Sequence, residues 1–88
     1  MGWSVEYSPR AARAMRKLDR PVARRIFDGV ERLAQLDEPM GSCKPLTGPF
    51  SGLWRLRVGD YRVILDIRRG ELVIVAVDLG HRSEIYDD

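Results

Sequence analysis

The sequence predicts an α+β fold in which a two-helix hairpin packs on one face of a small, mainly antiparallel sheet, in the order β-α-α-β-β-β. The first observation is a change of period: apolar residues recur at helical spacing in the first half of the chain and alternate at strand spacing in the second half. The second is length, because 88 residues bury one modest core. We therefore expect residues 1–88 to form a single domain.

Composition favours an ordinary globular protein, with 44% hydrophobic and 32% charged residues. No segment approaches the roughly 20 apolar residues that span a bilayer, and residues 1–10 lack the apolar run of a secretory signal. Cys43 is the single cysteine, so no internal disulfide is expected. We therefore predict a cytoplasmic protein with no metal, no cofactor and no membrane partner.

The first strand and helix are indicated by residues 3–18. Residues 3–8 alternate apolar and polar side chains, which is typical of a half-buried strand. Ser8 suits an N-cap and Pro9 suits the first helical position, so a helix is predicted from about Pro9 to Leu18. Its expected buried residues are Ala11, Met15 and Leu18, and its expected outer residues are Arg10, Arg13 and Lys17.

A second helix is predicted from Arg20, with Asp19 as its cap. Its apolar stripe consists of Val22, Ile26, Val30 and Leu33, which follow one another at helical spacing. Because the connection to the first helix is short, the two helices should form an antiparallel hairpin that packs against the sheet.

The second half of the chain predicts a loop and three strands. Residues 37–52 contain three prolines and three glycines, so they are expected to form a surface loop. Trp54–Val58 and Tyr61–Ile67 alternate as strands around a two-residue turn at Gly59-Asp60. A further reversal is expected at residues 69–70. Leu72–Val77 is apolar on both faces and should be the most buried strand.

The predicted hairpin register places arginines side by side. If Val58 pairs with Tyr61, Arg57 lies opposite Arg62, and like charges in that position cost about 0.2–1 kcal/mol. Arg55 then lies on the same face, away from the helices. Arginine binds phosphate through a planar fork, so this cluster indicates anion binding. A solvated outer face of an antiparallel sheet remains the alternative.

The last segment, GHRSEIYDD, places three further candidates just beyond the final predicted strand. His81 normally exchanges protons near neutral pH and is the natural general acid or base, although a lone surface histidine is often inert. Arg82 adds to the positive charge. Tyr86 either stacks on an unpaired base or closes the edge of the core.

The stretches KPLTG, WRLRVGDYRV and GHRSEIY, together with the first helix and ERLAQLDEP, resemble toxins of the RelE/ParE superfamily from bacterial type II toxin–antitoxin systems. The resemblance covers nearly the whole chain. It implies two helices on one face of a mainly antiparallel sheet. It also implies, for RelE-type members, cleavage of mRNA in the ribosomal A site by attack of a 2′-hydroxyl on the adjacent phosphate.

The resemblance also implies site residues. Arg55 and Arg57 fall where RelE carries two strand lysines, and Arg62 falls on its arginine after the aromatic residue. Tyr86 falls on its terminal tyrosine. Either His81 or Arg82 corresponds to the remaining arginine of RelE, because the segment after Gly80 is shorter in this chain than in RelE.

We assign expected roles accordingly. Arg57 and Arg62 hold the scissile phosphate, and Arg55 and Lys44 grip the flanking RNA backbone. In addition, Arg82 is expected to stabilise the transition state and His81 to act as acid or base, since arginine hardly ever loses its proton.

The expected partners are a cognate antitoxin, the ribosome and mRNA, with operator DNA bound only through the antitoxin complex. ParE-type members poison DNA gyrase instead, and a third alternative is an antitoxin-binding co-repressor module. The presence of Arg62, His81, Arg82 and Tyr86 favours RNA cleavage over gyrase poisoning.

Overall fold

A computed structural model describes residues 2–83 of the chain. Within these residues it contains two α-helices, three short 3-10 turns and one five-stranded sheet. The helices are α1 (Pro9–Arg16) and α2 (Arg20–Leu33), and the strands are β1 (Ser4–Tyr7), β2 (Lys44–Pro45), β3 (Trp54–Val58), β4 (Tyr61–Arg68) and β5 (Val73–His81). The predicted α+β class is confirmed, and β2 is an additional strand.

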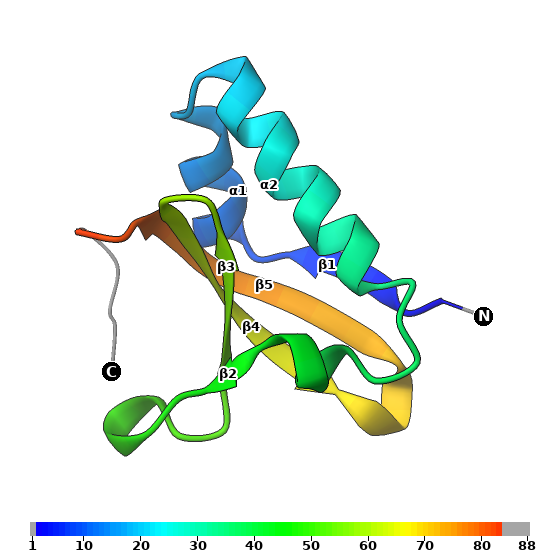
Figure 1. Cartoon of the computed structure of the whole chain (residues 1–88). Helices are drawn as coiled ribbons and strands as arrows, with labels where there is room; N and C mark the ends of the chain where they lie inside the picture. Colours follow the sequence, from blue (N-terminus) through cyan, green and yellow to red (C-terminus); the bar gives the residue numbers. More distant parts are fainter. Residues whose placement is uncertain (1, 84–88) are drawn as a thin grey trace.

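The sheet has the strand order β1-β5-β4-β3-β2. The β1–β5 pair is parallel and the other three pairs are antiparallel, so the sheet is mainly antiparallel, as predicted. Both helices cover the same face (Figure 1). Among the described residues, neither helix lies over the other face of β3 and β4.

The start of α1 agrees with the sequence. The Ser8 hydroxyl accepts the Ala11 N–H at 3.1 Å and donates to the Val77 carbonyl at 2.8 Å, which joins the helix start to β5. The helix ends at Arg16, two residues before the predicted end. Asp19 precedes α2 as expected but makes no side-chain capping bond.

One core lies between the helices and the sheet. The fully buried members are 0–4% exposed: Ala11, Ile26, Val30, Leu33, Ala34, Val63, Leu65, Ile74, Ala76 and Leu79. Met15, Leu18 and Val22 pack at its border and are only partly buried. The predicted apolar stripe of α2 is thus confirmed, with Ile26, Val30 and Leu33 buried and Val22 packed against the edge of the core.

The predicted bounds of the last strand were wrong at both ends. Leu72 is 47% exposed and has a positive φ of 55°, because it completes the chain reversal after Arg69–Glu71. The strand also continues beyond Val77, since its ladder with β4 extends as far as the pairing of Tyr61 with His81. The uninterrupted apolar run therefore begins one residue before the strand and covers only its first half.

The segment 37–52 is more structured than predicted. It contains 3-10 turns at Pro39–Ser42 and Gly48–Phe50 in addition to β2. Leu46 is 3% exposed, and its N–H donates to the Leu53 carbonyl at 3.0 Å. Among residues 2–83, neither helix is long and apolar enough to cross a membrane.

A candidate anion-binding face on the sheet

The β3–β4 hairpin fixes the positions of the central arginines. Gly59 has a φ of +60°, which glycine adopts without strain, and with Asp60 it forms the two-residue turn. Val58 pairs with Tyr61, and Arg57 therefore pairs with Arg62. The register predicted from the turn is confirmed.

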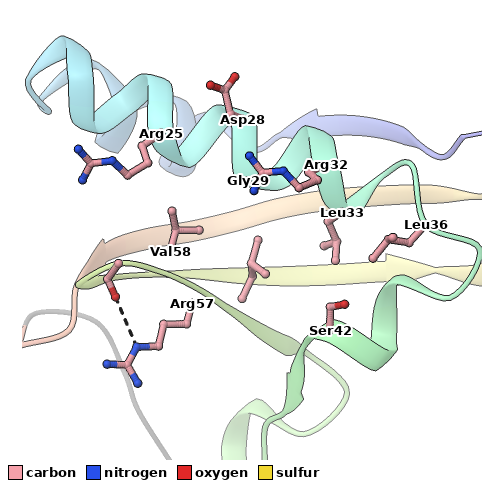
Figure 2. Close-up of a pocket in the computed structure, with 11 residues that line it drawn as sticks. Arg25, Asp28, Gly29, Arg32, Leu33, Leu36, Ser42, Arg57 and Val58 are labelled. Atoms are coloured by element: carbon pink, nitrogen blue, oxygen red, sulfur yellow. Dashed lines mark hydrogen bonds between the residues drawn. The ribbon is translucent and has the colours of Figure 1, made fainter.

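Arg57 and Arg62 lie on the face of the sheet that the helices do not cover. Val58, the neighbour of Arg57, packs toward α2, where a Cβ added to Gly29 would lie 3.1 Å from a Val58 methyl group. Figure 2 shows Val58 directed toward α2 and Arg57 on the opposite side of the strand. The Arg57 Nε–H donates to the Gly59 carbonyl at 3.4 Å, a long and exposed hydrogen bond.

Strand β2 adds Lys44 to this face. Lys44 pairs with Arg55 across β2 and β3, and Arg55 pairs with Ile64 across β3 and β4. Directly paired residues project on the same side of a sheet, so Lys44 and Arg55 form a second basic pair beside the first. We call the four residues Lys44, Arg55, Arg57 and Arg62 the basic face.

Arg82 lies at the end of the basic face, in the turn after β5. Its N–H donates to the Asp60 carbonyl at 2.8 Å, and its own carbonyl accepts a 2.8 Å bond from Arg62 Nη1. Its guanidinium approaches the Asp60 carboxylate at 4.0 Å, although both side chains are more than half exposed. The turn thus joins Arg82 to the tip of the hairpin.

His81 does not lie on the basic face. It is the last residue of β5 and pairs with Tyr61, and the two rings meet edge to face with centroids 5.4 Å apart. Tyr61 packs against the core, on the side of the sheet that the helices cover. The expectation that His81 follows the strand was wrong, and the structure separates its ring from Arg57 and Arg62.

A β-bulge explains the position of His81. Leu65 pairs with Ala76, but Ile64 pairs with Asp78, so β5 contains one extra residue at this point. The extra residue inverts the alternation of side chains in the rest of the strand. Leu79 accordingly reaches the core, and His81 shares its face.

Asp60 also belongs to this site, and the sequence did not predict that it contacts Arg82. The available signal was an acidic residue in a tight turn next to Tyr61-Arg62. Tyr86, which was also expected to belong to the site, lies outside the described residues.

An adjoining groove runs between α2 and β3 (Figure 2), with a volume of about 460 Å³. Apolar residues of its lining include Leu33, Leu56 and Val58. Its charged lining residues are Arg25, Asp28, Arg32 and Arg57. Arg57 therefore belongs both to the groove and to the basic face.

The basic face offers cationic hydrogen-bond donors. Guanidinium groups remain protonated and bind phosphate oxygens in pairs, so this face can hold an RNA or DNA backbone. Burial raises the pKa of the Cys43 thiol to about 11, which leaves little nucleophilic thiolate at neutral pH. Among residues 2–83, no three His, Cys, Asp or Glu side chains are grouped as metal ligands.

Structural similarity is strong to solved toxin–antitoxin proteins. The RelBE2 complex of Mycobacterium tuberculosis matches with a TM-score of 0.85 and 24% identity, over 93% of this chain and 100% of the other. The RelE–RelB complex of Pyrococcus horikoshii matches with a TM-score of 0.73 and 26% identity, over 97% and 100%. The isolated Escherichia coli RelE toxin matches with a TM-score of 0.69 and 18% identity, over 90% and 83%.

The family comparison agrees with the structural one. No curated protein sequence matches this chain. The family model described as the ParE toxin of the type II toxin–antitoxin system parDE matches residues 5–86, which is most of the chain. With its RelE-like fold, the chain therefore belongs to the ParE toxin family of type II toxin–antitoxin systems, within the RelE/ParE superfamily.

Proposed function

We propose that this toxin is a metal-independent endoribonuclease that acts in the cytoplasm, cleaves mRNA on the ribosome and thereby inhibits translation. The observation that carries the proposal is the direct pairing of Arg57 with Arg62 on the sheet face opposite α1 and α2, with Arg82 at its end. A pair of like charges opposes folding, and a bound phosphate offsets that cost.

The proposed reaction is a transesterification. The 2′-oxygen attacks the adjacent phosphorus and loses its proton, while the bond to the 5′-oxygen breaks and that oxygen gains a proton. The products are a 2′,3′-cyclic phosphate and a 5′-hydroxyl. Additional negative charge develops on the phosphate oxygens in the transition state, and preorganised donors there are commonly worth about 3–4 kcal/mol each.

Each residue of the basic face has a role in this proposal. Arg57 and Arg62 hold the scissile phosphate, and Arg82 stabilises the charge that develops on it. Lys44 and Arg55 lie on the same face, and Arg55 is two residues before Arg57 on β3. They hold the flanking RNA backbone. Tyr86 stacks on an unpaired base.

A cognate antitoxin is the proposed regulator, and we place one of its segments in the groove. The charged lining has three arginines against the single Asp28, so the segment should carry acidic residues beside apolar ones. Strand β2 pairs only with Trp54 and Arg55, so within the described residues the outer edge of β3 at residues 56–58 has no strand neighbour and can accept another strand. Because Arg57 lines the groove, this segment also blocks the basic face. Operator DNA is bound only through this complex.

The test is cleavage in a translating cell-free extract, with new RNA 5′ ends mapped by primer extension. We expect cuts at a fixed position in A-site codons that carry 5′-hydroxyls and disappear with Arg57→Ala. Arg25→Ala is the matched control, because Arg25 lines the groove but lies on α2. Intact message with the unmodified protein would refute the proposal.

Poisoning of DNA gyrase is the second candidate, because the matching family model is that of ParE toxins. The discriminating measurement incubates the protein with gyrase, ATP and supercoiled plasmid, followed by denaturation of the enzyme. Linear plasmid without cleavage of translated RNA would establish the second function in place of the first.

A further inference from the structure

We propose that His81 is a positioning residue that braces the turn carrying Arg82, and that it exchanges no proton with the RNA. This inference rests on the proposed RNA cleavage. The sequence indicated that His81 is a general acid or base. In the structure, its imidazole instead contacts Tyr61 and Ser83 of the same chain.

The first observation is the orientation of the ring. His81 is paired with Tyr61 on the helix-covered side of the sheet, and the two rings meet at an interplanar angle of 87°. Arg57 and Arg62 project from the other side. A general acid or base needs hydrogen-bond reach to the reacting oxygen, and the sheet lies between this ring and a phosphate held by the two arginines.

The second observation concerns Nδ1 of the His81 ring. The Ser83 N–H donates to Nδ1 at 3.3 Å, and the Ser83 hydroxyl oxygen lies 2.9 Å from the same nitrogen. A backbone N–H can only donate, so Nδ1 is the acceptor and the neutral ring carries its proton on Nε2. The contact joins a side chain to the N–H two residues later, as asparagine and aspartate do in Asx turns.

The third observation is that Arg82 lies between the two joined residues. Its N–H is bonded to the Asp60 carbonyl and its carbonyl is bonded to Arg62. The bond from the Ser83 N–H to His81 Nδ1 holds the residue that directly follows Arg82 in the chain. Loss of the Nδ1 acceptor therefore frees the chain immediately after Arg82 and lets its guanidinium leave the end of the basic face.

Three variants separate bracing from proton transfer, measured as the cleavage rate on programmed ribosomes. His81→Ala removes both the ring and the acceptor, and His81→Phe keeps a ring against Tyr61 without the acceptor. His81→Asn restores an acceptor for the Ser83 N–H but does not titrate. We expect alanine and phenylalanine to lower the rate by about ten- to hundredfold through misplacement of Arg82, and asparagine to recover most of it. An asparagine variant as slow as the alanine variant would overturn the proposal.

A second measurement does not depend on cleavage. The exchange rate of the Ser83 amide, followed by NMR on the free chain, should rise in His81→Ala and His81→Phe and return toward the original value in His81→Asn. Equal rates in all four proteins would overturn the brace. If the unmodified protein cleaves no RNA, the proposed function fails, and the amide exchange still decides whether His81 braces the turn.

Discussion

Replacing Arg57 by glutamine should make the protein more stable and less active. Arg57 and Arg62 are paired across the hairpin, and removal of a like-charge pair is worth about 0.2–1 kcal/mol. The substitution also removes the exposed 3.4 Å hydrogen bond from Arg57 to the Gly59 carbonyl. At that length this bond stabilises the fold by less than about 0.5 kcal/mol. We expect a net gain near 0.5 kcal/mol, or about 2–4 °C in Tm for a chain of this size.

Urea unfolding at low and high salt tests the physical origin of this gain. At ~1 M salt the screening length falls to about 3 Å, so the stability difference should largely vanish. Arg25→Gln is the control, because Arg25 lines the same groove but lies on α2 and is not part of this cross-strand pair, so it should show no comparable salt-dependent gain. RNA cleavage by Arg57→Gln should fall by about a hundredfold or more. A destabilised variant, or a gain that persists at high salt, would refute the repulsion between the two arginines.

Three further predictions concern the framework around the site. Tyr7→Phe should raise the unfolding free energy by about 1 kcal/mol, because the buried Tyr7 hydroxyl has no hydrogen-bond partner among residues 2–83. Burial and the nearby Glu31 carboxylate raise the pKa of Tyr7 from 10.0 to about 12, so its neutral form is favoured in the folded state. Unfolding followed against pH should therefore show stability falling between pH 10 and pH 12 in the unmodified protein and less so in Tyr7→Phe. Cys43 should react with a disulfide reagent about 100-fold more slowly than an unburied thiol at neutral pH, because its pKa is raised from 9.0 to about 11; an unfolded sample is the comparison. Ser8→Ala should lower the unfolding free energy by about 1–2 kcal/mol, measured with urea, since it loses both the helix cap and the bond to Val77, whereas Ser8→Asp should keep the cap.

The positions of the central arginines could be predicted from the sequence because a two-residue turn leaves little freedom. Once Gly59-Asp60 is recognised as the turn, the pairing of Val58 with Tyr61 fixes every pair behind it. The start of α1 was similarly constrained by Ser8 and Pro9, whose capping chemistry is local. These are the features in which neighbouring residues determine the geometry.

Features that depend on distant contacts could not be predicted. Strand β2 has only two residues, one of them proline, and it exists because Lys44 and Pro45 meet β3. The groove likewise requires the close approach of α2 to the sheet, where Gly29 faces Val58. Neither feature leaves a periodic pattern in the residues that form it.

The bulge in β5 decides which side chains share a face with Arg57 and Arg62. With strict alternation from Ala76, Leu79 and His81 would project onto the basic face and Gly80 would enter the core. The extra residue instead buries Leu79 at 4% exposure and places Gly80, which has no side chain, opposite Arg62. Burial of a leucine rather than a glycine is worth about 2 kcal/mol, which favours the bulged register over the regular one. The same energetic preference that completes the core therefore places the His81 side chain on the opposite side of the sheet from Arg57 and Arg62.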